Sequence, residues 1–478
     1  MKILIIISVA TILRLISINQ SLWLDEGSTA LVTQINLGDY FGKFAPGDFH
    51  PPLYYLTLKY WSAIGGQSET ALRLPSLILG VLSVYVVYLI GKTFDRRTGL
   101  LSSLFVATSG LHIYYSQEAR MYMMASFFVT LSVYFFVRTF KKHSKINTAA
   151  FYTSIIAATL THYLTLLMIP AFLVYSTWTR NRSSIKISIG SIIAVLAGQI
   201  LWLPVFTKQF TRGIGVEKSA ALWWNILGKT SPKEMALVPV KFVFGRVSVE
   251  NDLIYGLLSV TVVLFFSIII VRRYVSIKPF KIYLSSKDKL IWLWFTTPLL
   301  ISAAIGLFIP VFGYFRLLFV LPAMYLLLAR GVTGMKKFQA VTIAFILLIN
   351  LFSSFYYLAG KKFHREDWRG LENFVKNHSQ DNTALVVFPA SSQTEAYSYY
   401  YIKSLRNTFL CDGCAGPVKY GPKTDIKSNL DQIYYVRYLE NIFDPDASTV
   451  RYIETQEYNK KSEHRFNGLE LWLYENRN

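Results

Sequence analysis

Charged residues are scarce in this sequence. Asp, Glu, Lys and Arg together make up only 16% of the 478 residues, whereas 53% are hydrophobic and 16% are aromatic. Soluble domains carry about 25% charged residues, so this composition argues against an ordinary soluble protein. Apolar runs of about 20 residues, the length of a membrane-crossing helix, recur along the chain. The composition therefore predicts a polytopic α-helical membrane protein.

Acidic residues are the scarcer of the two charged classes, with 28 Asp and Glu against 49 Lys and Arg, giving a formal net charge of +21. A positive charge of this size could indicate nucleic-acid binding. Here, however, the basic blocks stand directly beside apolar runs, where they bias topology and contact anionic lipid. We therefore expect membrane lipid, and not nucleic acid, as a partner. The chain also lacks a glycine-rich phosphate loop, so nothing supports an ATP-driven pump.

The first apolar run, Met1 to Ile18, could be a signal peptide or a retained span. It contains Arg14 and is followed by no small-residue cleavage site, which favours a retained span. Apolar runs predict about eleven spans in all. They are Ile3 to Ile18, Leu72 to Gly91, Leu100 to Tyr115, Met121 to Val137, Thr148 to Thr161, Leu164 to Trp178, Ile187 to Phe206, Leu253 to Val271, Leu290 to Ile309, Tyr314 to Ala329 and Val341 to Leu358.

The basic loops predict the orientation. Alternating spans place "KTFDRRTG", "RTFKKHSK", "TRNRSSIK" and "RGVTGMKK" on one side, which the positive-inside rule makes cytoplasmic. An odd number of spans then puts the C-terminus outside, in a protein of the cell membrane. Several Lys and Arg residues of the predicted outer loop 207–252, Arg246 among them, are exceptions to this pattern. We expect a membrane domain over residues 1–360, with a large first outer loop at 19–71.

Residues 361–478 differ in character from the rest of the chain. Short β-rich runs such as "TALVVFP", "QIYYVRYL" and "LELWLYE" alternate with turn signals, which predicts a small soluble α/β domain outside the cytoplasm. The only two cysteines, Cys411 and Cys414, lie in it. A lone CxxC lacks the second ligand pair of a structural zinc site, so the alternatives are a disulfide and two reduced thiols.

Ionisable side chains gather in the predicted outer loops and at the outer ends of spans. Such residues near membrane depth are costly and often functional. Each of them could instead be an interface anchor or a structural ion pair, the interpretation we favour for Arg14 and Arg73. Four separate segments on one face make that interpretation weaker for the whole set. The set consists of Asp25, Glu26, Asp48, His50, Glu118, Arg120, His162 and Arg316.

The chemistry of these residue types suits group transfer from a phosphate-bearing lipid. A carboxylate at the membrane surface can act as a general base on an acceptor hydroxyl, and Arg residues near the headgroup plane can hold a phosphate leaving group. The same residues could line a transporter or flippase for lipid-linked sugars, or belong to a scaffold that presents the outer domain. Transporters place their sites near the bilayer midplane, often between repeats, and no convincing internal repeat occurs here.

Six motifs occur in an order that resembles the GT-C superfamily of membrane glycosyltransferases. They are "LWLDE", "HPPLYYLTL", "SETALRLPSLILGVLSVYVVYLIG", "SQEARMY", "FRLLFVLPA" and "REDWRGLENFV". Within the superfamily, the likeness is greatest to the prokaryotic relatives of dolichyl-phosphate-mannose protein mannosyltransferases and of the lipid A aminoarabinose transferase. It covers the membrane region and is most specific in residues 1–125. The resemblance implies a GT-C fold, a polyprenyl-phosphate sugar donor and an acceptor (protein, lipid or glycan) outside the cytoplasm.

The resemblance also implies roles for individual residues. Asp25 matches the catalytic base and Glu26 would support it. Glu118 matches an acidic position that contacts a metal or the acceptor, and Arg120 would face the donor phosphate. His50, with Asp48 beside it, would orient the loop or bind substrate or metal.

Further residues carry less specific expectations. Arg316 is a second candidate for the donor phosphate, and His162 and Tyr122 are additional candidates for the site. No cofactor is certain: dependence on a divalent metal (Mg, Mn or Zn) differs among relatives, so it does not transfer to this chain. One departure from the wider superfamily is the lack of a Trp-Trp-Asp acceptor signature after the last span. The segment "LWW" at Leu222 to Trp224 is followed by Asn225 and lies in an earlier loop. This argues against en bloc glycan transfer to Asn.

Overall fold

A computed structural model describes residues 1–141, 144–219, 228–277, 280–379, 384–389, 394–404, 418–420 and 430–476. The chain divides into two compact units. The first comprises residues 1–18, 36–64 and 73–359, and the second comprises residues 19–35, 65–72 and 360–478. The second unit therefore contains two segments of the predicted first outer loop together with the C-terminal region.

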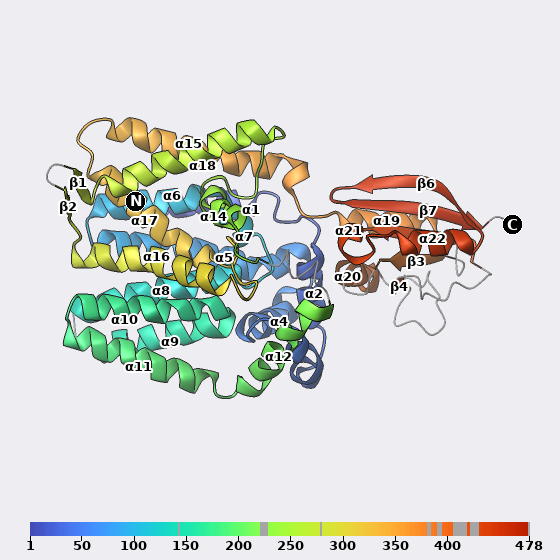
Figure 1. Ribbon diagram of the computed structural model, residues 1–478, viewed down its shortest axis with the longest axis horizontal. Coiled ribbons are helices and arrows are strands. Elements are labelled where there is room, and N and C mark those ends of the chain that lie inside the picture. Colours follow the sequence, from blue (N-terminus) through green and yellow to red (C-terminus); the bar gives the residue numbers. More distant parts are fainter. Residues whose placement is uncertain are drawn as a thin grey trace. The chain divides into compact units, whose positions relative to one another are not determined.

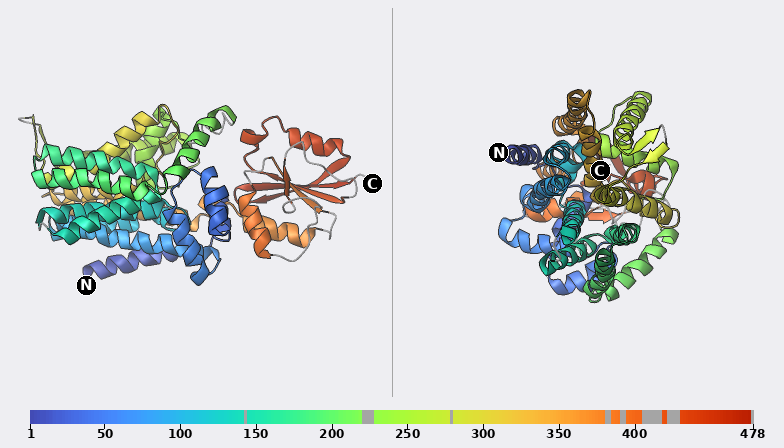
Figure 2. Two further views of the ribbon diagram at one scale, coloured as in Figure 1. Left: turned by 90° about the horizontal axis from the view of Figure 1, so that it is seen from below. Right: turned by 90° about the vertical axis from the view of Figure 1, so that its left-hand side faces the viewer.

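The first unit is a bundle of helices (Figures 1 and 2). Its elements are α1 (Lys2–Leu15), α3 (Leu37–Asp39), η1 (Tyr40–Phe44), η2 (Ala45–Gly47), α4 (Leu53–Gly65), α5 (Glu69–Lys92), α6 (Arg96–Thr108), α7 (Gly110–Ser116), α8 (Tyr122–Lys141), α9 (Lys145–Thr161), η3 (Tyr163–Leu167), α10 (Met168–Trp178), α11 (Arg182–Gln199), α12 (Leu203–Ser219), α14 (Pro232–Phe244), α15 (Asp252–Val271), α16 (Ser286–Ile305), η4 (Leu318–Val320), α17 (Leu321–Thr333) and α18 (Gln339–Ala359), with a hairpin of β1 (Val275–Ile277) and β2 (Phe280–Ile282). In Figure 1, α8, α9, α10 and α11 lie side by side.

Each of the predicted spans overlaps a helix of this bundle. Among the described residues, five helices are long and apolar enough to cross a membrane, and a sixth is obtained if α11 and α12 are counted as one bent span. The five are α5, the 122–139 part of α8, α15, α16 and α18. The others are shorter apolar helices, such as the 14-residue α1. The count of eleven spans stays a prediction.

Two predicted spans are not continuous helices. The run from Leu100 to Tyr115 breaks at Ser109, whose extended backbone (φ −68°, ψ 120°) separates α6 from α7. The run from Ile187 to Phe206 ends its helix at Gln199, where the chain turns by 87° into α12. Hydrophobicity alone predicts neither interruption, because the residues on both sides are apolar.

Arg14 supports the first of these breaks from the neighbouring helix α1. Its guanidinium donates hydrogen bonds to the carbonyl oxygens of Ala107 at 3.0 Å and Val106 at 3.3 Å, and its Nε donates to Ser116 Oγ at 3.1 Å. Arg14 is fully buried. The break frees helix carbonyls where no water can pair them, and the guanidinium supplies the missing donors. Arg14 thus has a structural role, but it pairs backbone carbonyls and is not the interface anchor or ion-pair member that we favoured.

Helix α18 supplies the remaining donors at the break. Asn350 Nδ2 donates to the carbonyl oxygen of Phe105 at 3.0 Å, and Ser354 Oγ donates to that of Thr108 at 2.8 Å. Both side chains are fully buried. The last carbonyls of α6 are thus paired by polar side chains of two other helices, and the break is a built feature of the bundle.

The second unit is built around a five-stranded mixed sheet in the order β4-β3-β5-β7-β6. Strand β3 is parallel to β4 and β5, whereas β7 is antiparallel to both β5 and β6. Helices lie on both faces of the sheet (Figure 2). The elements are α2 (Leu24–Val32), η5 (Lys361–Phe363), α19 (Trp368–His378), β3 (Ala384–Phe388), α20 (Glu395–Ser404), β4 (Val418–Tyr420), β5 (Gln432–Arg437), α21 (Glu440–Phe443), α22 (Ser448–Thr455), β6 (Tyr458–Phe466) and β7 (Leu469–Asn476).

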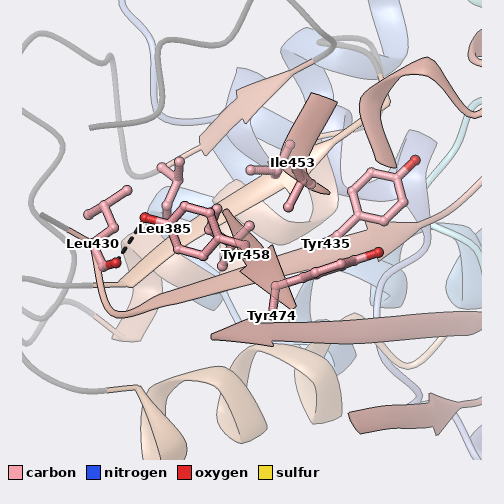
Figure 3. Close-up of a cluster of buried hydrophobic side chains, with 8 residues drawn as sticks. Leu385, Leu430, Tyr435, Ile453, Tyr458 and Tyr474 are labelled. Atoms are coloured by element: carbon pink, nitrogen blue, oxygen red, sulfur yellow. Dashed lines mark hydrogen bonds between the residues drawn. The ribbon is translucent and has the colours of Figure 1, made fainter. Parts of the chain in front are cut away.

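The two faces of the sheet follow the two-residue period of a strand. On one face, Leu385, Tyr435 and Tyr474 pack with Ile453 of α22 in a buried cluster, which also contains Tyr458 (Figure 3). On the other face, alternate residues such as Phe388 meet α19 and α20, as the stacking of Trp368 on Phe388 shows. The sheet is therefore buried on both sides.

Segments of the first predicted loop pack into this second unit. The Cα of Gly27 in α2 approaches α20 so closely that a Cβ there would lie 2.4 Å from the Cα of Ala396. The hydroxyl of Tyr400 accepts a hydrogen bond from the Leu22 amide at 2.7 Å and lies 3.1 Å from Glu69 Oε1. The C-terminal region and the loop segments therefore share one core.

The pairing at the α6 break predicts a specific loss of stability. Changing Arg14 to Met keeps an apolar stem but removes the side-chain donor of the Ala107 carbonyl, at a cost of about 1–3 kcal/mol. The Val106 carbonyl keeps only its bond from the Ser109 amide at 3.3 Å. We expect a lower yield of monodisperse protein in detergent and a lower thermal midpoint. The matched change Arg138→Met removes an exposed Arg and should leave both unchanged. Equal behaviour of the two variants would contradict the capping role.

Candidate active site

Asp48 and His50 form a pair in the loop between η2 and α4. His50 Nδ1 lies 3.2 Å from Asp48 Oδ1, and the two side chains are only 18% and 16% exposed. Burial by itself raises the pKa of Asp48, but the attraction and hydrogen bond of His50 and the charge of Arg120 outweigh it and lower the pKa to about 2. The carboxylate is therefore ionised at neutral pH and accepts the hydrogen bond, so His50 Nδ1 donates it.

Arg120 joins this pair from the turn after α7. Its Nη1 donates a hydrogen bond to the hydroxyl of Tyr55 at 3.2 Å, and burial together with the nearby Asp48 contributes to raising the pKa of Tyr55. Both side chains are buried, so their interactions with the carboxylate are only weakly screened. Tyr55, at the start of α4, connects the two predicted outer loops and is a site residue that the sequence did not indicate.

His162 approaches from the end of α9. Its Nδ1 accepts a hydrogen bond from the Leu164 amide at 3.2 Å, so the neutral ring carries its proton on Nε2. Burial, followed by the nearby charges of His50, Arg316 and Arg120, holds the pKa of His162 well below its ordinary value. The ring is therefore neutral at pH 7. Its centroid lies 6.2 Å from that of His50.

Arg316 lies in the turn between α16 and η4. Its Nη1 donates to the carbonyl oxygen of Pro310 at 2.7 Å, and its guanidinium stands 5.0 Å above the ring of Phe315. Phe315 in turn packs edge to face on Tyr122, whose ring lies 6.0 Å from that of His162. The structure thus brings together most of the sequence-predicted residues of the first unit. They are Asp48, His50, Arg120, Tyr122, His162 and Arg316.

Glu118 belongs to the edge of the same region. It is buried and interacts electrostatically with Arg246 and Tyr115. Arg246, which follows α14, stands 5.0 Å over the ring of Tyr114. Arg246 was not a predicted site residue, although its place among the basic exceptions in a predicted outer loop was a signal that could have identified it.

An apolar cavity of about 240 Å³ opens between α14, α16 and α17. Phe312 lines it, and the backbone amide of Phe312 donates to the Gly228 carbonyl at 2.9 Å. Phe312 lies on the same short connection as Arg316, four residues before it in the sequence. Its lining residues are Met235, Val238, Pro239, Phe242, Phe295, Leu299, Leu300, Ala303, Phe312 and Met324.

Asp25 and Glu26 lie on the first turn of α2, in the second unit, and their environments differ. Glu26 is fully buried, with its Oε2 3.6 Å from Nε of the buried Arg365. The same oxygen accepts a hydrogen bond from the Trp23 amide at 3.4 Å. Glu26 is thus held by an ion pair and by the end of its own helix, whereas Asp25 is half-buried.

Asp25 faces acidic and phenolic groups of the C-terminal region. Burial and then the charge of Asp25 raise the pKa of Glu395. The pKa of Tyr438 is raised by burial, by its hydrogen-bond partner Glu366 at 3.2 Å, and by Asp25 and Glu395. Sequence analysis did not indicate Glu395 or Tyr438, because more than 300 residues separate them from Asp25. Glu366, however, lies in the "REDWR" motif.

Two sequence predictions have no counterpart in the described part of the chain. Cys411 and Cys414 lie outside the described residues. Among the described residues, no group of three or more His, Cys, Asp or Glu side chains is arranged to hold a metal ion. The pair of Asp48 and His50 by itself does not make a metal centre, so we derive no step through a metal.

Comparison with known proteins adds two observations. Residues 49–207 match the sequence model of the family described as dolichyl-phosphate-mannose-protein mannosyltransferase. This segment contains Asp48's partner His50 as well as Glu118, Arg120 and His162. No curated protein is significantly similar to the chain in sequence.

Solved structures share the fold over nearly the whole chain. ArnT from Cupriavidus metallidurans bound to undecaprenyl phosphate has a TM-score of 0.60 at 10% identity, over 98% of this chain and 97% of ArnT. The Archaeoglobus fulgidus oligosaccharyltransferase in complex with Zn and sulfate has a TM-score of 0.54 at 12% identity, over 100% and 73%. The same archaeal enzyme, AglB, with an inhibitory peptide and a dolichol-phosphate, gives 0.54 at 11%, over 98% and 74%. The resemblance to the GT-C superfamily is therefore confirmed: the chain is a multi-pass membrane protein with the fold of these membrane glycosyltransferases.

Proposed function

We propose that the protein is a glycosyltransferase that moves a sugar from a polyprenyl-phosphate-linked donor to an acceptor (protein, lipid or glycan) outside the cytoplasm. The observation that carries the proposal is the convergence of Asp48, His50, Arg120, His162 and Arg316 from separate segments of the bundle. The fold is that of ArnT and AglB, whose structures contain undecaprenyl phosphate and dolichol-phosphate. Both of those ligands are polyprenyl phosphates.

Cationic side chains are the proposed holders of the donor phosphate. Arg120 and Arg316 both lie close enough to His162 for their charges to lower its pKa, so they are near one another. Arg246 is a third candidate, beside Glu118. A guanidinium forms charge-assisted hydrogen bonds with a phosphate and stabilises the charge that grows as the sugar leaves. Neutral His162 supplies an Nε2–H donor without adding charge.

The apolar cavity beside the Arg316 connection suits the start of the donor's prenyl chain. Its lining is entirely hydrophobic, as expected for a groove that takes a hydrocarbon. A lipid with a phosphate head and an isoprenoid tail needs a cation next to an apolar groove. The connection that carries Phe312 and Arg316 provides both within five residues of one another.

Asp25 is the proposed general base. As the acceptor oxygen bonds to the anomeric carbon, Asp25 takes its proton, the bond from that carbon to the phosphate oxygen breaks, and the polyprenyl phosphate departs. A base must be accessible to the acceptor, which fits the half-buried Asp25 better than the enclosed Glu26. Glu26 is proposed to hold the first turn of α2 in place through Arg365.

A transporter or flippase of lipid-linked sugars is less well supported. Transport would need polar groups through the depth of the bilayer. Three buried polar residues of the helices, Arg14, Asn350 and Ser354, are engaged in pairing the carbonyls of α6. A scaffold, in turn, would not need a buried ionised carboxylate near Arg120.

The proposed orientation places the second unit outside the cytoplasm. Reporter fusions after Lys142 and after Lys289 should report the cytoplasm, while a fusion at Asn478 should report the outside. The expectation follows from the basic loops at the first two positions. A cytoplasmic C-terminus would put Asp25 on the wrong face and would overturn the proposal.

Loss of the proposed phosphate contacts should weaken donor binding. Replacing Arg316 by Ala or Arg120 by Gln removes charge-assisted hydrogen bonds worth about 1.5–3 kcal/mol, so the dissociation constant should rise about tenfold to a hundredfold. Binding of a polyprenyl phosphate to purified protein in nanodiscs measures this. The control Arg272→Ala removes an exposed Arg of the opposite loops and should bind normally. Normal affinity in both site variants would remove these residues from the donor site.

The role of Asp25 is tested in a transfer assay with a panel of radiolabelled polyprenyl-phosphate sugars. Asp25→Asn keeps the shape of the side chain but removes the base, so turnover should fall about a hundredfold to ten-thousandfold while donor binding survives. Glu26→Gln removes the charge opposite Arg365 and should instead lower the yield of folded protein, with near-normal turnover per folded molecule. Near-normal turnover of Asp25→Asn would refute the assignment of the base.

A further inference from the structure

Helix α12 changes direction abruptly at the end of an apolar helix. The axes of α11 and of the first part of α12, residues 203–213, differ by 87°, and Figure 1 shows α11 running into α12 through this bend. Together, α11 and residues 203–213 of α12 are long and apolar enough to cross a membrane, but only as a bent pair. If α11 crosses the bilayer, a right-angled continuation runs along the membrane surface.

The described part of α12 has two distinct faces. Leu203, Phe206 and Phe210 are 54%, 36% and 52% exposed and are spaced by three and four residues, so they form one stripe on the helix. Lys208 and Arg212 are exposed on the other side of the helix. An apolar aromatic stripe with cations on the polar side is typical of a helix that lies in the interface of an anionic membrane.

Gln209, which is only 3% exposed, lies on a third side of α12, between the apolar stripe and Arg212. Its Nε2 donates to the carbonyl oxygens of Ala45 at 2.7 Å and His50 at 3.2 Å. Its Oε1 accepts from the hydroxyl of Tyr163 at 2.6 Å. Both amide hydrogens and the amide oxygen are therefore used, which orients the side chain without ambiguity. The two accepting carbonyls enclose the segment that carries Asp48.

The network continues to the bend and to the second His of the site. Trp202, at the bend itself, donates its Nε1–H to the Tyr163 hydroxyl at 2.7 Å. Tyr163 directly follows His162 in the sequence. A single, partly buried chain of hydrogen bonds thus connects the bend between α11 and α12 with the backbone of His50 and with the neighbour of His162.

We propose that α12 is an interfacial helix seated on anionic lipid, and that its Gln209 is a positioning residue that holds the segment of Asp48 and His50. The membrane surface fixes the height and rotation of α12 through its apolar stripe. Gln209 then transmits that position to the carbonyls of Ala45 and His50. The inference extends the proposed function, because the segment that it positions belongs to the proposed donor site.

The test uses the full-length protein in nanodiscs that contain phosphatidylglycerol, and it reads hydrogen exchange by mass spectrometry. Gln209→Leu removes the bonds to both carbonyls, and the amides of residues 44–50 should exchange at least about tenfold faster. The control Thr211→Ala alters an exposed residue of the same helix whose hydroxyl bonds only to Thr207. It should match the wild type. Unchanged exchange in Gln209→Leu would overturn the positioning role.

The lipid contact is tested by Phe206→Ser combined with Phe210→Ser. We expect α12 to exchange faster in this variant than in the wild type, and we expect the wild-type helix to be better protected in phosphatidylglycerol than in phosphatidylcholine. A variant whose α12 exchanges like the wild type would overturn the interfacial placement. Size-exclusion profiles confirm that each variant is folded.

A measurement of transfer activity tests the part of the inference that depends on the proposed function. Gln209→Leu should reduce transfer, but in a His50→Ala background it should cause less than about a twofold further loss, because both changes act on one segment. Independent, multiplicative losses would contradict a role exerted through His50. If no polyprenyl-phosphate sugar is turned over by the wild type, the proposed function fails, while the exchange measurements still decide the positioning role.

Discussion

Backbone carbonyls buried within a membrane bundle must be paired, and the pairing at the end of α6 determines how the first unit is organised. A helix that stops inside a bilayer leaves its last carbonyls without partners. Here the donors come from Arg14 on α1 and from Asn350 and Ser354 on α18. Helices α1 and α18 are therefore both hydrogen-bonded to the end of α6. Beyond this point, α7 takes a new direction.

The new direction of α7 is what brings the second outer turn to the site. Gln117 Nε2 donates to the carbonyl oxygens of Arg14 at 3.0 Å and Ile16 at 2.6 Å, and its Oε1 accepts from the Tyr357 hydroxyl at 3.0 Å. The turn is thus tied to the ends of α1 and α18, the helices that also pair the break. Arg120 follows three residues later and reaches Tyr55. The contacts that pair the break and those that hold the turn of Arg120 therefore involve the same two helices, α1 and α18.

The sequence was sufficient for those features that depend on local composition. Apolar runs predicted the positions of the helices, and the alternation of β-rich runs with turn signals indicated the C-terminal α/β region. The predicted outer loops contained Asp48, His50, Arg120 and Arg316. It did not reveal the break at Ser109 or the bend after Gln199. Those interruptions exist because side chains on other helices pair the freed backbone groups, and a hydrophobicity pattern carries no information about such partners.

Site residues were missed for a related reason. Tyr55 and Gln209 are an aromatic and an amide in amphipathic helices, where their types are unremarkable, and only the distant groups they contact give them a role. Glu395 and Tyr438 are brought near Asp25 by the folding of a domain that begins more than 300 residues later. Glu366 lies in the "REDWR" motif, but sequence analysis assigned it no role. A charged residue in a predicted outer loop can be identified from the sequence, but the distant residue that it contacts cannot.

Neighbouring acids in this chain show why adjacency does not imply a shared role. Consecutive residues on a helix point about 100° apart, so Asp25 and Glu26 face different surroundings from the same turn. Glu26 meets the guanidinium of Arg365, and removing either partner would strand a buried charge. Asp25 meets Glu395 and Tyr438, groups whose pKa values its own charge raises. A carboxylate fully enclosed by an ion pair leaves no room for a substrate, whereas a half-buried carboxylate is accessible to one. The different roles proposed for Asp25 and Glu26 therefore follow from helix geometry acting on two identical functional groups.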